Sequence, residues 1–155
     1  MDDHDNVAGK NLNIRTAIDE NIERIVELDA EAGGMRREDF FRKRWQAMHS
    51  DLDAYIAFAA FYGESVTGFA IAHILSGEFG TDDRYAIVDG FAVDASHRRS
   101  GIGGELIEAL KDEARLRGCT DVRTQVEWQR QDLLTFLAGL DFTPAPVIAL
   151  ERELG

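Results

Sequence analysis

The segment Val93-Asp-Ala-Ser-His-Arg98-Arg99-Ser100-Gly101-Ile102-Gly103-Gly104-Glu105-Leu106 places two adjacent arginines and three glycines between an apolar run and an amphipathic one. Where a helix begins, its first amide groups have no intrahelical acceptor, and the helix dipole adds partial positive charge. Glycines let an anion approach these amides closely, and the two arginines add formal charge. The turn is therefore predicted to bind a phosphate or pyrophosphate group.

Two common phosphate-binding motifs do not fit this turn. A P-loop consists of Gly, four further residues and then Gly-Lys-Ser or Gly-Lys-Thr, and the chain contains no such run. A dinucleotide-binding fingerprint that began at Gly101 would need glycine at position 106, where Leu106 stands. Nucleoside triphosphate hydrolysis and a Rossmann-type dinucleotide site are therefore disfavoured.

Hydrophobic periodicity predicts the elements on both sides of the turn. A strand at 85–94 precedes it, a helix at 101–117 ending at Gly118 follows, and a strand at 119–128 comes next. This order is typical of a crossover between parallel strands. The other predicted elements are, in chain order, a strand at 12–17, helices at 18–33 and 37–50, strands at 54–62 and 65–75 joined by Gly63-Glu64, a short helix capped by Asp132, and a strand at 147–150.

Length and charge restrict the class of protein. The chain has 155 residues, 45% of them hydrophobic, so we expect one domain at 12–155 after a flexible tail at 1–11. Lys and Arg number 17 against 29 Asp and Glu, and the net charge of −12 argues against a nucleic-acid partner. The start shows no export signal, no apolar run could span a membrane, and the single cysteine, Cys119, suits a reducing compartment. A cytoplasmic protein with no membrane partner is expected.

The turn also matches a family motif. Arg98-Arg99-Ser100-Gly101-Ile102-Gly103 has the pattern Arg/Gln-x-x-Gly-x-Gly/Ala of the acetyl-CoA loop in the GNAT acetyltransferase superfamily. The predicted order of elements resembles that family from residue 12 to residue 152. The resemblance implies an α/β fold in three layers, with a central mixed sheet of about six to seven strands flanked by about four helices.

The resemblance implies acetyl-CoA as the cofactor. Backbone amides from Arg99 to Gly104 would hold the CoA pyrophosphate, and main-chain groups of Phe91 to Val93 would contact the pantetheine arm. The strands at 85–94 and 119–128 would separate to admit the thioester, and N–H groups near Phe91 would polarise its carbonyl. The implied cofactor-binding residues are Phe91, Ala92, Val93, Arg98, Arg99, Ser100, Gly101, Ile102, Gly103 and Gly104.

Acetylation of an amine requires a base, because the acceptor ammonium must lose a proton before it attacks. Asp89 is the first candidate, since strand alternation places it on one face with Ile87, Phe91 and Val93, where it would be desolvated. Many GNAT members carry an acidic residue at this strand position. The alternative is an aspartate paired with a nearby arginine for structural reasons. Glu127, on the predicted strand at 119–128, is the reserve candidate.

The chain departs from the family near its C-terminus. A general-acid tyrosine often lies in a Phe-Tyr-x-x-Leu-Gly-Phe run, whereas the segment 136–142 here has Leu137 at the tyrosine position and Asp141 at the glycine position. Gln129 and Arg130 stand where an asparagine often follows the fifth strand. Either water or Tyr85 protonates the thiolate, or the thiolate leaves unassisted, or the domain binds acyl-CoA without efficient turnover.

These observations lead to one function and two alternatives. The expected function is transfer of an acetyl group from acetyl-CoA to a primary amine, on a small molecule or a protein lysine, by direct attack in a ternary complex. The charge of −12 and the acidic loop at 78–83 favour a cationic acceptor. The alternatives are a non-catalytic acyl-CoA-binding or sensing module and a purely structural domain. No metal site is expected from the histidine spacing, His73 lies either at the acceptor site or in the core, and a homodimer is compatible with the resemblance.

Overall fold

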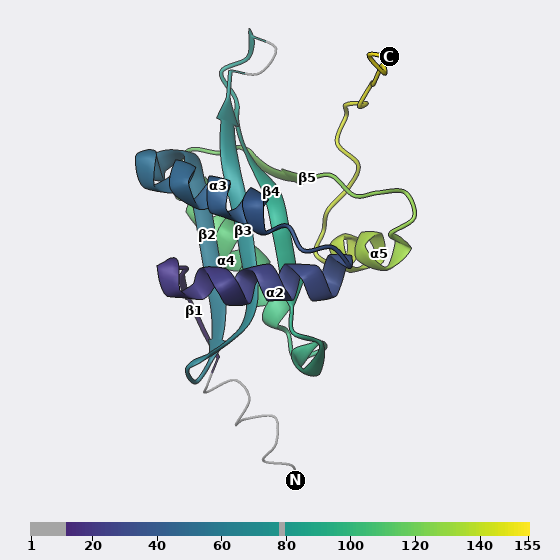
Figure 1. Cartoon of the computed structure of the whole chain (residues 1–155). Helices are drawn as coiled ribbons and strands as arrows, with labels where there is room; N and C mark the ends of the chain where they lie inside the picture. The colour runs from purple at the N-terminus through teal and green to yellow at the C-terminus, as the bar shows by residue number, and fades with distance from the viewer. Residues whose placement is uncertain (1–11, 78–79) are drawn as a thin grey trace. The chain divides into compact units, whose positions relative to one another are not determined.

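The computed structural model of the chain describes residues 12–77 and 80–155 (Figure 1). The predicted tail at 1–11 and Glu78 lie outside the described residues. The chain divides after Thr124 into two compact units. The single domain predicted at 12–155 stays a prediction.

A five-stranded sheet of order β1-β2-β3-β4-β5 runs through the described part of the first unit. The first four strands follow one another in antiparallel pairs, and β5 joins β4 in parallel, as the predicted crossover requires. The β2–β3 hairpin closes on the pair Tyr62 and Ser65, and Gly63 in its turn has a left-handed φ of 62°. The strands are β1 (Leu12–Thr16), β2 (Tyr55–Tyr62), β3 (Ser65–Ser76), β4 (Arg84–Val93) and β5 (Asp121–Thr124).

Helices cover both faces of this sheet, which confirms the predicted three layers. In Figure 1, α2 (Ile22–Gly33) and α3 (Glu38–Ser50) lie in front of the sheet and α4 (Ile102–Leu116) lies behind it. Each helix buries an apolar stripe against the sheet, and a fully buried aliphatic side chain contributes about 1.5–3 kcal/mol. Short 3-10 helices lie at η1 (Asp19–Asn21), η2 (Leu52–Ala54) and η4 (Ala95–His97). No helix of the described residues is long and apolar enough to cross a membrane.

Two apolar clusters form the core, one on each face of the sheet. The front cluster joins α2 and α3 to the sheet through Val26, Leu28, Phe41, Trp45, Phe69 and Ile71. The rear cluster joins α4 to the sheet through Ile56, Ala70, Ala86, Leu106 and Leu110. Small residues in the central strands let the helices lie close to the sheet, so the end of β4 and the start of α4 are held rigidly together.

A β-bulge interrupts the pairing of β3 with β4 at Asp89. Ile71 pairs with Gly90 and Ala72 with Val88, so Asp89 is the extra residue. The predicted alternation with Phe91 and Val93 is therefore wrong. Those two side chains pack against the rear cluster, whereas the Asp89 carboxylate meets Arg44 of α3 on the front face.

The second unit contains α5 (Gln131–Gly139), as predicted, but its start and its C-terminal side differ from the prediction. Arg130 is the N-cap residue, while Asp132 lies in the first turn and accepts a hydrogen bond from the Arg130 guanidinium. No strand forms at 147–150, where Val147, Ile148 and Leu150 are exposed. The neighbouring Pro144 and Pro146 have no amide hydrogen for a strand ladder.

The sheet of the described residues is therefore smaller than the predicted six to seven strands. The missing strand at 147–150 accounts for part of the difference. The predicted strand at 119–128 is also shortened to β5, which ends with the pair Val88 and Thr124 directly before the bulge. A bulge disrupts the regular ladder and bends its strand, which gives a physical reason for β5 to end there.

Candidate functional site

The predicted anion-binding turn connects β4 to α4. Asp94 follows β4 and caps η4, and Gly101 is the N-cap residue of α4 with a left-handed φ of 83°. Arg99 also has a left-handed φ, of 69°, which is uncommon for a residue with a side chain. The amides of Ile102, Gly103 and Gly104 lie in the first helical turn, where no intrahelical acceptor exists.

The turn is exposed on its arginine side and anchored on its helical side. Arg98, Arg99 and Ser100 are exposed, whereas Ile102 and Gly103 are buried. The Ser100 hydroxyl donates a hydrogen bond to the carbonyl of His97, which closes the turn on itself. A cavity of about 310 Å³ lies beside it, lined by Leu12, Asn13, Ile14, Tyr62, Ser100, Ile102 and Glu105. The buried start of α4 therefore fixes the position of the turn, while the helix amides and the two arginines remain available to a ligand.

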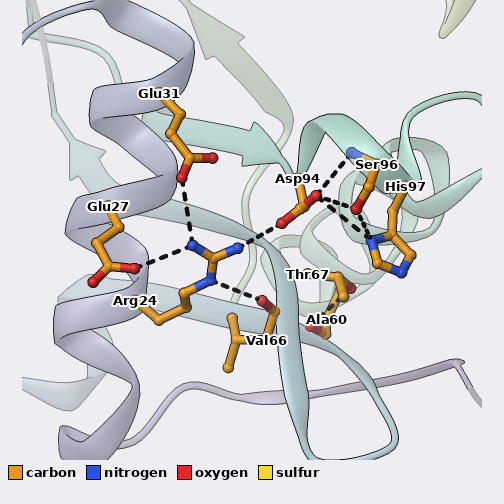
Figure 2. Close-up of polar contacts among 9 residues, drawn as sticks. All are labelled: Arg24, Glu27, Glu31, Ala60, Val66, Thr67, Asp94, Ser96 and His97. Carbon is orange, nitrogen blue, oxygen red and sulfur yellow. Dashed lines mark hydrogen bonds and ion pairs between the residues drawn. The ribbon is translucent and has the colours of Figure 1, made fainter.

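An ion pair links this turn to α2, as Figure 2 shows. Arg24 Nη2 lies 2.5 Å from Asp94 Oδ2, and Arg24 Nε donates to the carbonyl of Val66 at 3.3 Å. The other Asp94 oxygen accepts from the amide of Ser96 at 2.8 Å and from its hydroxyl at 2.5 Å. These bonds to Ser96, with the charge of Arg24, lower the pKa of Asp94. Sequence reasoning missed Arg24, because nothing in the helical periodicity of α2 indicates its partner.

We expect Asp94 to stabilise the fold in a pH-dependent way. Because its pKa is lowered in the folded state, its contribution is complete above about pH 4–5 and is lost as the pH falls through the folded-state pKa. Asp94→Asn should lower the free energy of unfolding by about 1–2 kcal/mol at neutral pH. The difference from the unmodified protein should shrink below about pH 4. Urea unfolding of both proteins across this range measures it.

Asp112→Asn is the matched control for that prediction. Asp112 also pairs with an arginine, Arg115, but its side chain is 68% exposed. Exposed ion pairs contribute at most about 1 kcal/mol, so this variant should change the free energy of unfolding little. An Asp94→Asn effect as small as the control, or one that persists unchanged into acid, would contradict the role given to Asp94.

The ladder between β4 and β5 covers only the first part of β4. Its last pair is Val88 and Thr124, and the Thr124 hydroxyl donates to the Val88 carbonyl at 3.2 Å. β4 itself continues to Val93. The predicted contact residues Phe91, Ala92 and Val93 thus lie on the part of β4 beyond the ladder, in line with the predicted separation of the strands.

Asp89 lies at the centre of a polar cluster on the front face. His73 Nδ1 is 2.7 Å from Asp89 Oδ2, and Arg44 Nε is 3.6 Å from the same oxygen. Arg37 Nη2 donates to the Asp89 carbonyl at 3.4 Å. Arg37 also donates to the buried Asp29 carboxylate, from Nε at 2.8 Å and from Nη2 at 2.7 Å. The hydrogen bond to Asp29 raises the pKa of Arg37. Asp89, the predicted candidate base, is therefore also paired with an arginine, as the alternative interpretation expected, and in addition it contacts His73.

The other predicted residues of the first unit, Tyr85 and Cys119, lie outside this cluster. Glu127 is exposed and lies beyond the end of β5, so its predicted place on that strand is wrong. The Tyr85 hydroxyl donates to Asp83 at 3.3 Å. Cys119 packs against the rear cluster, and burial raises the pKa of its thiol. In the described residues, no group of three or more His, Cys, Asp or Glu side chains is arranged to hold a metal ion.

The first unit has a mixed sheet with helices on both faces, and a glycine-rich turn with two arginines precedes α4. These features define an enzyme-like domain that holds a phosphate-bearing cofactor. Residues 15–136 match the profile of the acetyltransferase (GNAT) family. The chain belongs to this family. No curated protein sequence matches the chain.

Solved structures share this fold at low sequence identity. A transcriptional regulator from Bacillus halodurans C-125 is 21% identical with a TM-score of 0.77, over 92% of this chain and 99% of the other. An aminoglycoside acetyltransferase, meta-AAC0020, from an uncultured soil metagenomic sample in complex with sisomicin is 17% identical with a TM-score of 0.75, over 95% and 99%. The enzyme AAC(6')-Iy in complex with the bisubstrate analogue CoA-S-monomethyl-acetylneamine is 18% identical with a TM-score of 0.77, over 92% and 97%. At these identities the likeness shows the fold alone.

Proposed function

We propose that this protein transfers an acetyl group from acetyl-CoA to a primary amine by direct attack in a ternary complex. The observation that carries the proposal is the turn at 98–104, which has the family's acetyl-CoA pattern and lies at the start of α4. Family membership supports acetyl transfer in general and acetyl-CoA as the donor. A bound CoA analogue in AAC(6')-Iy, which shares the fold, is consistent with this cofactor.

Different residues of the chain bind different parts of the cofactor. Amides from Arg99 to Gly104 bind the pyrophosphate, and Arg98 and Arg99 add charge. Main-chain groups of Phe91, Ala92 and Val93, beyond the end of the β4–β5 ladder, bind the pantetheine arm and polarise the thioester carbonyl. When bound, acetyl-CoA supplies the activated acetyl group. The polar cluster around Asp89 removes the proton from the acceptor ammonium, and Glu127 is the second candidate on sequence grounds alone.

The acceptor is proposed to be a cationic amine, on a small molecule or a protein lysine. The two acetyltransferases named above were crystallised with sisomicin and with an acetylneamine conjugate, which are amine-bearing ligands of those proteins. The net charge of −12 attracts cations over the surface of this chain. Asp82 and Asp83 are exposed in the loop before β4 and add to this attraction.

One observation favours a second candidate, an acyl-CoA-binding module without efficient turnover. Leu137, at the position of the family's usual acid, is 7% exposed and has no proton to donate. Another group would then have to protonate the departing thiolate. Water is adequate for this, because a thiolate is a weakly basic leaving group; a free cysteine thiol, for comparison, has a pKa of about 8.5.

Calorimetric titration with acetyl-CoA, and with NAD as a control, tests the cofactor first. We expect acetyl-CoA to bind in the micromolar range and NAD not to bind. Amine-dependent release of CoA, followed with a thiol reagent over a panel of aminoglycosides, polyamines and lysine peptides, then separates an enzyme from a binding module. Binding without release would favour the binding module, and absence of acetyl-CoA binding by the folded protein would overturn both proposals.

A further inference from the structure

His73 and Asp89 form a pair that sequence spacing does not reveal, since they lie 16 residues apart on adjacent strands. His73 Nδ1 and Asp89 Oδ2 are 2.7 Å apart, and their side chains are 18% and 11% exposed. Asp89 is the extra residue of the bulge, and its carboxylate lies on the front face beside β3 and α3. Asp89 directly follows Val88, the last residue of β4 in the β4–β5 ladder.

The hydrogen bond to Asp89 determines which imidazole nitrogen is free. A carboxylate only accepts hydrogen bonds, so Nδ1 must carry the hydrogen, and in the neutral ring Nε2 then has a lone pair. In the described part of the chain, the buried side-chain atom that lacks a hydrogen bond is Arg84 Nε, and not His73 Nε2. His73 Nε2 has no hydrogen-bond partner among the described residues, and it is not one of their buried atoms that lack a partner, so nothing in the described part of the chain occupies it.

Asp89 itself is poorly placed to accept a proton from an acceptor. Its Oδ2 already receives the His73 Nδ1–H and lies 3.6 Å from the Arg44 guanidinium. That oxygen is therefore already engaged by a hydrogen-bond donor and by a cation. A carboxylate in this setting is suited to orienting an imidazole, as it does in other His-carboxylate pairs.

We propose that His73 is the catalytic base of this protein, with Nε2 as the proton acceptor and Asp89 as its positioning residue. This inference rests on the proposed acetyl transfer. Nε2 takes one proton from the acceptor ammonium. The lone pair of the resulting amine forms the N–C bond while the C–S bond breaks, and that electron pair leaves on sulfur. The second ammonium proton passes from nitrogen to water, water protonates the thiolate, and His73 returns its proton to water.

The charged and titratable surroundings of His73 come from three elements. Asp89 faces it from β4, Arg44 from α3, and Tyr55 is its cross-strand partner on β2. Arg37 contacts the Asp89 carbonyl and is neutralised by Asp29.

The tautomer of His73 is the first test, and it needs no acceptor. Long-range proton–nitrogen spectra of the 15N-labelled protein, assigned by the signals lost in His73→Gln, should show Nδ1–H and an unprotonated Nε2. Asp89→Asn should abolish this preference, because the Asn oxygen would turn toward Arg44 and its amide group toward Nδ1. An Nε2–H tautomer in the unmodified protein would overturn the proposal.

Activity of His73→Ala is the second test. Its kcat should fall by about 10²–10⁴-fold, while its affinity for acetyl-CoA stays unchanged. Added imidazole should restore part of the lost rate, which a structural role would not allow. His49→Gln is the matched control, because His49 also contacts a carboxylate, that of Asp19 at 3.3 Å, but lies on the exposed side of α3.

The outcomes separate this inference from the proposed function. Full activity of a folded His73→Ala, or a loss that imidazole does not restore, would overturn His73 as base and leave acetyl transfer intact. Absence of turnover in the unmodified protein with every amine would instead contradict the proposed function. His73→Gln, with a side chain of similar size, replaces His73→Ala if the latter does not fold, and its full activity would equally overturn the proposal.

Discussion

Gly101→Ala is expected to weaken acetyl-CoA binding by about 10- to 100-fold. Gly101 is the N-cap residue of α4 and has a φ of 83°, which costs an L-residue about 1–2 kcal/mol. Relief of that strain moves the first amides of α4 away from the position in which they bind the pyrophosphate. Loss of one hydrogen bond to a charged group costs about 1.5–3 kcal/mol, which corresponds to this change in affinity. Calorimetry on both proteins measures it.

Gly118→Ala is the matched control, because it applies the same strain at the other end of the same helix. Gly118 has a φ of 80°, and an added Cβ would meet its nearest neighbour, Arg84, at an ordinary 4.0 Å. Both variants should lose similar amounts of unfolding free energy, but acetyl-CoA binding should weaken only in Gly101→Ala. Equal affinities in the two variants would show that the turn at 98–104 does not hold the cofactor.

Most of the fold could be predicted because local signals and tertiary packing agree in the first unit. The stripe of Ile102, Leu106, Leu110 and Ala114 predicts a helix, and the same residues are buried in the rear cluster. The glycine pair 33–34 predicts the end of a helix, and α2 ends there with Gly34 in the left-handed region. A fold can be predicted from sequence where local preferences and tertiary packing favour the same structure in this way.

Two predictions near the C-terminus were wrong, the strand at 147–150 and the N-cap residue of α5, because the amino-acid types in these segments do not by themselves determine the structure. Residues 147–150 have the β-branched and apolar character of a strand, but a strand forms only where a neighbour satisfies its amides and carbonyls. Asp132 has the chemistry of an N-cap residue, yet the N-cap of α5 is Arg130, two residues earlier. Propensity alone does not determine either outcome.

The binding turn was predictable, whereas the polar cluster was not. The turn is a contiguous motif, so its glycines and arginines are visible in the sequence. His73 and Asp89 lie 16 residues apart on adjacent strands, so no contiguous motif shows their pairing. The bulge in β4 also breaks the alternation that predicted Asp89 on one face with Phe91 and Val93. The contact of Arg24 with Asp94 spans 70 residues and leaves no local pattern.

Leu106→Ala is expected to lower the free energy of unfolding by about 2–5 kcal/mol, because it removes a fully buried side chain and leaves a cavity. Leu106 lies in the rear cluster, one turn after the amides that are proposed to hold the pyrophosphate. Because the first turn of α4 is fixed by this packing, acetyl-CoA binding should weaken as well. Urea unfolding and calorimetry of the same preparation measure both effects.

Leu116→Ala supplies the comparison, since it makes the same chemical change on the same helix. The Leu116 side chain is 83% exposed, so its removal should alter the free energy of unfolding by no more than about 0.5 kcal/mol. A similar small loss in both variants would contradict the packing of α4 against the sheet. A large loss in Leu106→Ala with unchanged acetyl-CoA affinity would instead show that the binding turn holds its shape without the core beneath it, through the Arg24 and Asp94 link alone.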